Sequence, residues 1–212
     1  MKKKRYVLEH ILIAAGVLVA ALERMHPYTK GHSQRISVIA YKLALAANRE
    51  LELKLSKEDI EFIRIGALLH DIGKITVGET TLDNPNRFLT TDQIRDLEDH
   101  PYEGEQILRK SGVEFPRIIY DCVFSHHESW DGNHAGNMQG YPRGLAGKEI
   151  PIAGRIVAIA DTFDAMTSQR TYQKKLTPKD AVTQLRKLAG ERLDPKLVCV
   201  FIAHVFPNLQ LD

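Results

Sequence analysis

Histidine and aspartate are concentrated where several apolar helical segments end. The chain has nine histidines, and six of them lie between residues 32 and 134. His70 and Asp71 are consecutive at the end of one apolar segment, and His126 and His127 follow the apolar face of another. Consecutive residues of a helix point about 100° apart, so both reach one ion only beyond the helix end. Paired histidines are also costly to bury unless each nitrogen has a partner. The pattern therefore indicates a site and not core packing.

These side chains supply enough nitrogen and oxygen donors for two metal ions, with one carboxylate as the bridge. Without thiolates, such donors suit Fe, Mn, Zn, Co or Ni. Two ions roughly 3.5–4 Å apart activate a bridging water and stabilise both oxygens of an in-line displacement at phosphorus. Phosphodiester hydrolysis is therefore the predicted reaction class. The expected donors are His32, His70, Asp71, His100, His126, His127 and Asp161, whereas His10, His26 and His204 are expected to be structural and the role of His134 stays open. A lone His32 or His100 would more often be a surface or capping residue.

Two cations are candidates for holding a substrate phosphate. Lys74 follows His70 by about one helical turn, and Arg170 lies downstream of Asp161. Arginine offers a bidentate fork and lysine a point charge, although either residue alone is more often a solvated surface side chain. The 29 basic and 27 acidic residues leave a net charge of +2. This balance excludes a broad basic surface for a nucleic-acid polymer or an anionic membrane, but it allows a local pocket for a small phosphorylated ligand.

Helices are expected to position these residues, because no stretch shows the sustained apolar/polar alternation of a strand. Ser56 and Thr90 each begin a capping-box pattern. The first predicted helix leads to His70, and the second ends near His100. Further helices are predicted from Pro116 to His126, from near Ile152 past Asp161 and Asp164, and from Thr177-Pro178. We therefore predict an all-α fold, a compact helical bundle that forms one domain over 1–212.

Two segments stand apart from this helical pattern. The glycine-rich segment 129–151 predicts a long ordered loop, and loops of that length inside a compact domain are usually functional. The basic start and the apolar run 11–22 superficially match a signal peptide, but the run is too short to span a bilayer. We expect a buried first helix without a membrane span; a secreted or anchored form is the alternative. Cys122 and Cys199 form no CxxC pattern, which fits a reducing cytoplasm.

A series of spaced motifs follows in order along the chain. They read Tyr28-Thr29-x-Gly31-His32-Ser33-x-Arg35, His70-Asp71-Ile72-Gly73-Lys74, His100-Pro101-x-x-Gly104, His126-His127-Glu128-x-x-Asp131-Gly132, Gly140-Tyr141-Pro142-x-Gly144-Leu145, and Arg155-Ile156 to Asp161-x-x-Asp164-Ala165-x-Thr167-x-x-Arg170-x-Tyr172. Together they resemble the HD-GYP family, cyclic di-GMP phosphodiesterases of the HD phosphohydrolase superfamily. The resemblance extends from about residue 8 to residue 201.

This resemblance implies an all-helical HD core with a bi- or trinuclear metal centre, and hydrolysis of cyclic di-GMP to linear pGpG by a metal-bound hydroxide. Whether the reaction stops at pGpG or continues to GMP stays open. By position, the seven expected donors are the ligands, and Asp71 is the bridge. Asp71 and Lys74 take the catalytic roles, and Lys74, Arg170, Tyr141 and Pro142 bind substrate. The Gly140-Tyr141-Pro142 loop is also implicated in contacts with diguanylate cyclase domains.

The sequence departs from the family pattern at several positions. Tyr28 replaces a glutamate that helps to bind a third ion in this family, so we expect two ions. Fe or Mn is favoured over Zn, Co or Ni. With two ions only, His127 is the ligand that the centre requires least. Six extra residues lie within 133–139. Gln173 stands where a basic residue is common, and Asn84-Pro85 replaces Lys-Pro. Fewer cations should weaken the binding of a diphosphate ligand unless Lys174 or Lys175 compensates.

Two alternatives to cyclic di-GMP hydrolysis therefore stay open. One is an HD hydrolase of another cyclic dinucleotide or nucleotide. The other is a catalytically weak binding or signalling module that acts through the Gly-Tyr-Pro loop. The sequence shows no receiver, sensor or cyclase module, so we expect regulation in trans or through oligomerisation, for example as a homodimer.

Overall fold

The structure is a computed structural model that describes residues 2–82, 89–132, 140–168 and 175–209. Helices make up most of these residues and no strand occurs among them, which confirms the predicted all-α fold. The α-helices are α1 (Lys2–Met25), α2 (His32–Glu50), α3 (Lys57–Leu69), α4 (Glu79–Leu82), α5 (Thr91–Glu98), α6 (His100–Lys110), α7 (Arg117–Ser125), α8 (Ile152–Thr167), α9 (Pro178–Leu188) and α10 (Pro195–Val200). A short 3₁₀ helix, η2 (Ile72–Thr76), follows α3.

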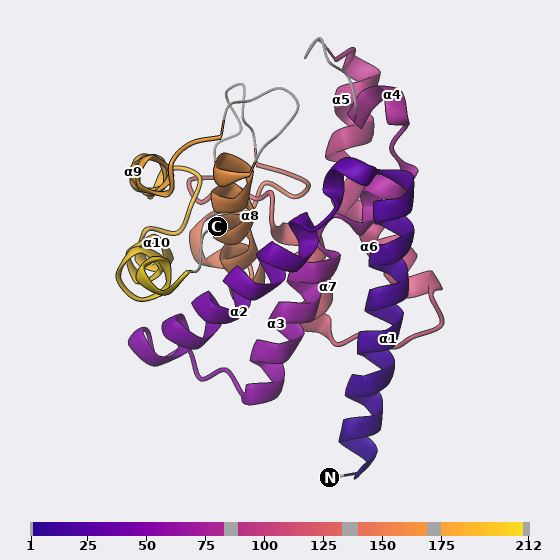
Figure 1. Cartoon of the computed structure of the whole chain (residues 1–212), viewed down its shortest axis with the longest axis horizontal. Helices are drawn as coiled ribbons and strands as arrows, with labels where there is room; N and C mark the ends of the chain where they lie inside the picture. Colours follow the sequence, from indigo (N-terminus) through magenta and orange to yellow (C-terminus); the bar gives the residue numbers. More distant parts are fainter. Residues whose placement is uncertain (1, 83–88, 133–139, 169–174, 210–212) are drawn as a thin grey trace.

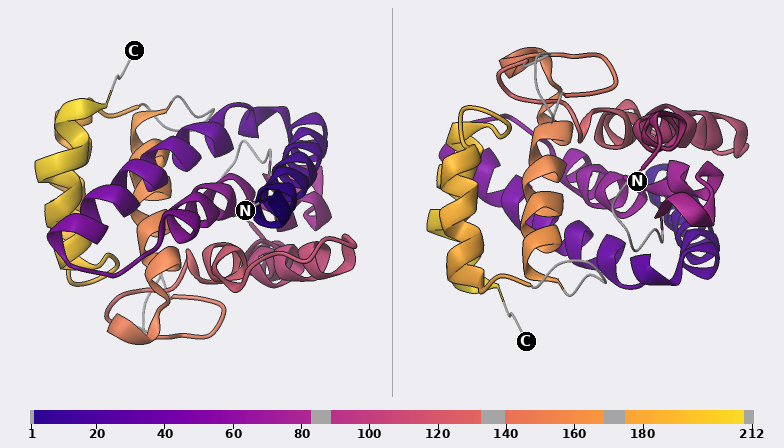
Figure 2. Two further views of the ribbon diagram at one scale, coloured as in Figure 1. Left: turned by 90° about the horizontal axis from the view of Figure 1, so that it is seen from below. Right: turned by 90° about the horizontal axis from the view of Figure 1, so that it is seen from above.

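The helices form a bundle in which α1 and α10 lie at opposite sides (Figures 1 and 2). Between them, α2 packs on α3 and α8, and α3 packs on α7. Two apolar clusters fill the interior. The first lies among α2, α3, α7, α8, α9 and α10, and the second lies among α1, α3, η2, α6 and α7. Because α3 and α7 contribute side chains to both clusters, they form the centre of the molecule.

The predicted helix starts are confirmed by their hydrogen bonds. The side chains of Ser56, Thr90 and Thr177 each accept from the backbone N–H three residues later, at the starts of α3, α5 and α9. The helix from Thr90 ends near His100 as expected, but a new helix, α6, begins there at once. Pro101 lies in the first turn of α6, where its missing N–H costs no intrahelical hydrogen bond.

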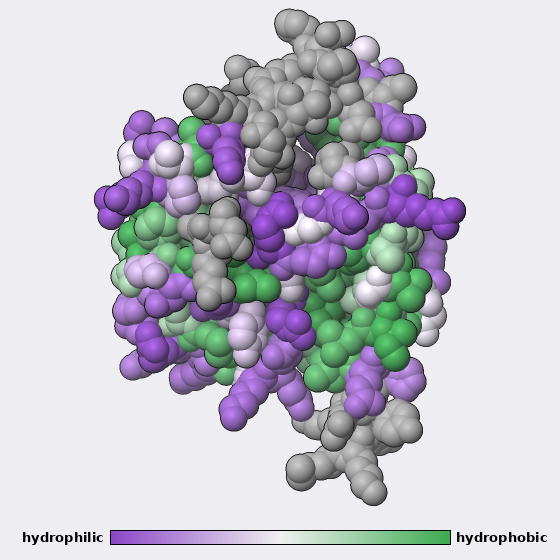
Figure 3. All heavy atoms as spheres, in the orientation of Figure 1, coloured by the Kyte–Doolittle hydropathy of each residue, from purple (hydrophilic) through white to green (hydrophobic). Residues whose placement is uncertain are grey.

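The first helix is buried on one face only. Ile11, Ala15 and Leu22 are buried in the second apolar cluster, whereas Ile13 and Val17 are 67% and 66% exposed. Figure 3 shows apolar surface on the side where α1 runs. The expectation of a buried helix is thus right for its inner face. Within the described residues, no helix is both long and apolar enough to cross a membrane.

A close approach of two backbones joins η2 to α6. A Cβ atom added to Gly73 would lie 1.8 Å from the carbonyl oxygen of His100 and 2.5 Å from the backbone nitrogen of Gly104. Both distances are far below any real contact, so only glycine fits at position 73. This contact brings the segment after Asp71 against the start of α6, and so brings Asp71 near His100.

Candidate metal centre

The ends of four helices meet around one region that holds all seven expected metal donors. Helices α3 and α7 end there, and α2 and α6 begin there. His32 starts α2, His70 and Asp71 follow α3, His100 starts α6, His126 and His127 follow α7, and Asp161 lies within α8. The structure therefore brings together residues that are up to 129 positions apart, from His32 to Asp161.

Three of the histidines are aimed by the helix that ends beside them. Nδ1 of His70 lies 2.9 Å from the carbonyl oxygen of Ala67. Nδ1 of His126 lies 2.9 Å from that of Val123, and His100 makes the same contact, at 2.5 Å, with the residue three before it. These carbonyls lie in the last turns of helices, where the usual intrahelical N–H partner is missing. Because a carbonyl only accepts, each Nδ1 donates, and each Nε2 presents its lone pair to the site.

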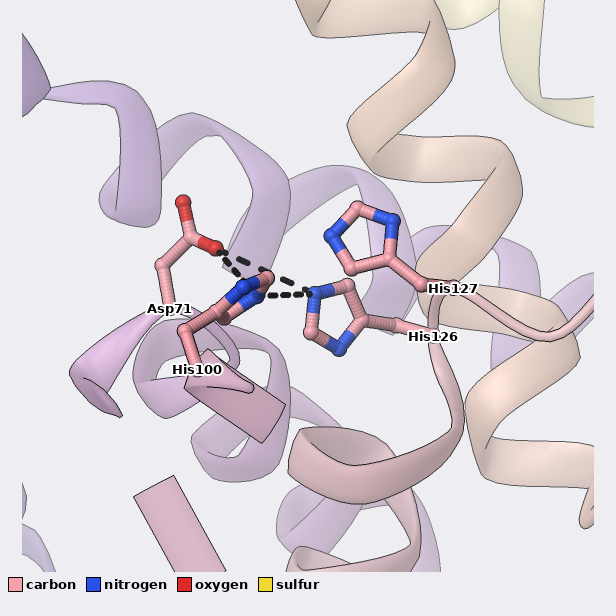
Figure 4. Close-up of side chains that lie close together, drawn as sticks. All are labelled: Asp71, His100, His126 and His127. Atoms are coloured by element: carbon pink, nitrogen blue, oxygen red, sulfur yellow. Dashed lines mark hydrogen bonds and ion pairs between the residues drawn. The ribbon is translucent and has the colours of Figure 1, made fainter. Parts of the chain in front are cut away.

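The first donor group consists of Asp71, His100, His126 and His127 (Figure 4). Oδ1 of Asp71 lies 3.3 Å from Nε2 of His100 and 3.8 Å from Nε2 of His126. The two Nε2 atoms are 3.4 Å apart. Donors about 2.1 Å from one ion, at angles near 90–110°, lie roughly 3.0–3.4 Å from each other. The spacing of the group is therefore close to that of ligands that share an ion.

The second donor group consists of His32, His70 and Asp71, with Asp161 beside them. Oδ2 of Asp71 lies 3.4 Å from Nε2 of His70 and 3.8 Å from Nε2 of His32. Oδ1 of Asp161 is 3.4 Å from Nε2 of His32. Each carboxylate oxygen of Asp71 thus faces a different donor group, which is the geometry that a bridging ligand requires.

The chemistry of these donors fits divalent metal ions. The lone pairs of His100 and His126 face each other and a carboxylate oxygen, so the first group holds acceptors with no proton among them. Burial lowers the pKa of His126 to about 3, so this ring stays neutral. Nε2 of His70 is fully buried and makes no hydrogen bond. Unpartnered buried acceptors are costly, and a cation between them removes that cost.

His32 is held differently from the other histidines. It starts a helix, where no free carbonyl is available, and its Nδ1 lies 2.7 Å from Oδ2 of Asp164. Arg35 donates to both oxygens of that carboxylate, at 2.6 and 3.0 Å. Burial alone would lower the pKa of His32, but hydrogen bonds with Asp161 and Asp164 raise it to about 9. Asp164 therefore orients His32 and stabilises its proton.

The predicted phosphate ligand Lys74 lies at the second donor group. Its Nζ atom is 2.6 Å from Oδ2 of Asp71, and its side chain is 19% exposed. Burial would raise the pKa of Asp71, but electrostatic interactions with His70 and Lys74 hold it well below the usual range. Arg170, the second predicted phosphate ligand, lies outside the described residues, as do His134 and Gln173.

The Gly-Tyr-Pro loop lies beside the first donor group, as expected. The ring of Tyr141 stacks on that of His127, with 4.7 Å between centroids and 23° between planes. It also meets the ring of His100 edge-on at 6.3 Å. Pro142, the neighbouring residue, is exposed. Tyr141 therefore covers the side of the centre at which His127 lies.

Two residues without an assigned role make buried contacts at the site or at the loop beside it. Asp164 holds His32, and Glu128 is buried beside the loop, where it accepts hydrogen bonds from the backbone N–H groups of Arg143 and Leu145. Asp164 follows Asp161 by three residues on one helix, and such residues share a face. That spacing was the available signal for Asp164, whereas nothing local to Glu128 indicates its partners. His10 and His204 lie outside both donor groups.

Comparison with known proteins agrees with this geometry. A model of the HD domain family matches residues 17–197. A cyclic di-GMP phosphodiesterase of Thermotoga maritima is 34% identical over 82% of this chain and 44% of its own length. The 3′3′-cGAMP-specific phosphodiesterase 2 of Vibrio cholerae is 31% identical over 88% of this chain and 33% of its own length. The chain thus spans less than half the length of these curated relatives.

The fold also matches a solved structure. The HD domain of the phosphodiesterase PgpH from L. monocytogenes, in complex with cyclic-di-AMP, superposes with a TM-score of 0.60 and 17% identity, over 90% of this chain and 93% of that one. At this identity the match concerns the fold alone. With a family model that spans most of the chain and the converging helix ends, the resemblance to HD-GYP proteins is confirmed, and the chain belongs to the HD domain family.

Proposed function

We propose that this chain is a metal-dependent phosphodiesterase that hydrolyses cyclic di-GMP to linear pGpG, and onward to GMP. The observation that supports it most directly is the arrangement of buried acceptors around Asp71, whose two oxygens face two donor groups. The names of the curated relatives support a cyclic dinucleotide as the substrate class. The chain would act as one domain, with a core over about 8–201.

The two donor groups would hold one divalent ion each, with Asp71 between them and Fe or Mn as the favoured ions. Bound there, such ions supply an activated water and neutralise charge on a phosphate. The protein supplies the rest. His70, His100 and His126 are aimed by backbone carbonyls and His32 by Asp164, so the donors are in place before an ion arrives.

Substrate binding would involve Lys74 and the loop. When metal ions bind the carboxylate of Asp71, they replace Lys74 as its ionic partner. Lys74 can then hold a non-bridging phosphate oxygen, together with Arg170. Tyr141, with Pro142 next to it, covers one side of the centre and offers an aromatic ring to a nucleobase. We further propose a cytoplasmic location, on the ground that Cys122 and Cys199 are both free.

A second candidate is hydrolysis of a different cyclic dinucleotide. It is favoured by the name of a relative that acts on 3′3′-cGAMP and by the solved HD domain with cyclic-di-AMP. The donor geometry supports the reaction class. Specificity for one nucleobase would depend on the residues that contact that nucleobase. Both candidates therefore share one experiment.

The test is to purify the protein anaerobically, measure Fe and Mn per chain, and follow hydrolysis of cyclic di-GMP, 3′3′-cGAMP and cyclic di-AMP. We expect up to two ions per chain and turnover of cyclic di-GMP that stops after chelation. The D71N variant keeps the size of the side chain, and it should lose both metal and turnover. A protein with a full metal complement and no turnover of any of the three would refute the phosphodiesterase and favour a binding module.

A further inference from the structure

Glu128 is a buried acid whose partners all belong to the Gly-Tyr-Pro loop or to the helix end next to it. Its side chain is 0% exposed. One carboxylate oxygen accepts the backbone N–H of Arg143 at 2.9 Å, and the other accepts that of Leu145 at 2.8 Å. A buried carboxylate is retained only when its oxygens are satisfied, so these two bonds make the loop and Glu128 depend on each other.

The guanidinium of Arg143 links the loop to the end of α7. It donates to Oγ of Ser125 at 2.9 Å, and its Nε lies 3.8 Å from the Glu128 carboxylate. It also lies over the ring of Phe124, 5.0 Å from the centroid. The loop therefore returns to the last residues of α7, directly before the metal donors His126 and His127. The charge of Glu128 is offset by one arginine and two amide dipoles.

The other end of the loop is fixed to the same segment. The backbone N–H of Tyr141 donates to the carbonyl of His127 at 3.2 Å, beneath the stacked rings. A Cβ atom on Gly140 would lie 2.4 Å from the backbone nitrogen of Ser129, so this contact requires glycine. Residues 140–145 thus run closely along residues 125–129.

We propose that Glu128 is a positioning residue: by fastening residues 143–145 it holds Tyr141 against His127, and so fixes the ring of His127 toward the ion of the first donor group. This inference rests on the proposed function only in requiring that the first donor group binds a metal. Glu128 touches neither donor atoms nor substrate, and it acts through Tyr141. His127 is only partly buried, and its ring lies against those of His126 and His100 as well as that of Tyr141, so the stacked tyrosine limits its rotation.

The test is metal retention in Co²⁺-loaded protein, whose visible absorption reports the ligands. Loss of absorption after excess EDTA gives the release rate. E128Q replaces one acceptor oxygen by an amide NH₂ and breaks one loop bond, so we expect release from one site to be about 10–100-fold faster, the range typical of residues that orient ligands. E149Q is the matched control, since exposed Glu149 accepts one backbone N–H, that of Ala146, in the same loop.

A second variant separates positioning from misfolding. Y141L removes the stacked ring without disturbing a buried charge, and it should accelerate the same release phase. If Glu128 acts through Tyr141, the double variant releases Co²⁺ no faster than Y141L alone. Wild-type release in E128Q, or equal acceleration by E149Q, would overturn the inference. Failure of the protein to hydrolyse any cyclic dinucleotide would leave this result standing, whereas failure of the wild type to bind Co²⁺ would overturn both proposals.

Discussion

Asp164 lies 2.7 Å from Nδ1 of His32, across 132 positions of sequence, and is the only carboxylate in the described structure within hydrogen-bond distance of that nitrogen. Asp164 accepts the Nδ1 proton of His32, as a helix-end carbonyl does for His70 and His126. The difference follows from position, because a helix start offers N–H groups and a helix end offers carbonyls. A histidine at a helix start therefore needs an acceptor from another element.

Replacing Asp164 by Asn should weaken metal binding in the second donor group. The amide keeps the shape of the side chain but loses the charge that orients His32 and stabilises its N–H. We expect Mn²⁺ affinity at one site to fall by about 10–100-fold while the other site is little changed. Isothermal titration of the metal-free protein measures both. D180N, on an exposed cap of α9, is the control, and equal affinities in all three proteins would contradict the assignment.

Metal binding should release a proton from His32 near neutral pH. Its pKa of about 9 in the metal-free protein means that the ring is protonated at pH 7, and ligation requires the neutral form. The buried His126, with its pKa lowered to about 3, has no proton to lose. Release at the second site should therefore approach one proton per ion at pH 7 and vanish above about pH 10. Titrations in buffers of different ionisation enthalpy count the protons, and pH-independent release would rule out this account.

Gly73→Ala should damage both stability and metal binding. The added Cβ would collide with the carbonyl of His100, so η2 and α6 must separate and His100 must move from Asp71. Overpacking of this kind costs about 1–3 kcal/mol. Gly16→Ala is the matched control, because nothing lies within 4 Å of its added Cβ and alanine favours a helix by up to about 1 kcal/mol. In urea unfolding, Gly73→Ala should lower the free energy of unfolding and Gly16→Ala should raise it. An unchanged free energy of unfolding for Gly73→Ala would disprove the close contact.

Removal of metal should lower the melting temperature. An ion that binds only the folded chain stabilises it by about 2.7 kcal/mol when its free concentration is 100 times Kd, or roughly 5–10 °C at this chain length. Calorimetry with Mn²⁺, and again after EDTA, measures the shift. D71N should show almost no shift because it removes charge from both donor groups. If the melting temperature of the wild-type protein does not change with Mn²⁺, that result would argue against a metal centre.

Local signals were sufficient to predict the helices of this fold. Capping boxes at Ser56 and Thr90 are made within four residues, so the sequence pattern contains all of their partners. The donors His70, His126 and His127 were also predictable, since each lies where an apolar helical pattern stops. The end of the helix from Thr90 near His100 was predicted as well, but the immediate start of α6 at that point was not.

Residues that act on the donors from other elements could not be predicted in the same way. The role of Asp164 requires α8 to pack beside the start of α2, and that of Glu128 requires the loop to return along α7. Lys74 was expected near phosphate, yet its position on Asp71 depends on the carboxylate being charged and buried. Such contacts arise from tertiary packing, which local sequence does not encode.

The carbonyl contacts of His70, His100 and His126 also bear on how tolerant this chain is to length changes. Each ring takes its direction from a backbone carbonyl three residues earlier, in the last turn of a helix. One residue inserted into α3 or α7 would therefore rotate the donor by about 100° and point it elsewhere. An insertion beyond these helices leaves their final turns intact. Variation in length is therefore expected to accumulate in connecting segments, while the registers of α3 and α7 remain constant among chains that keep this centre.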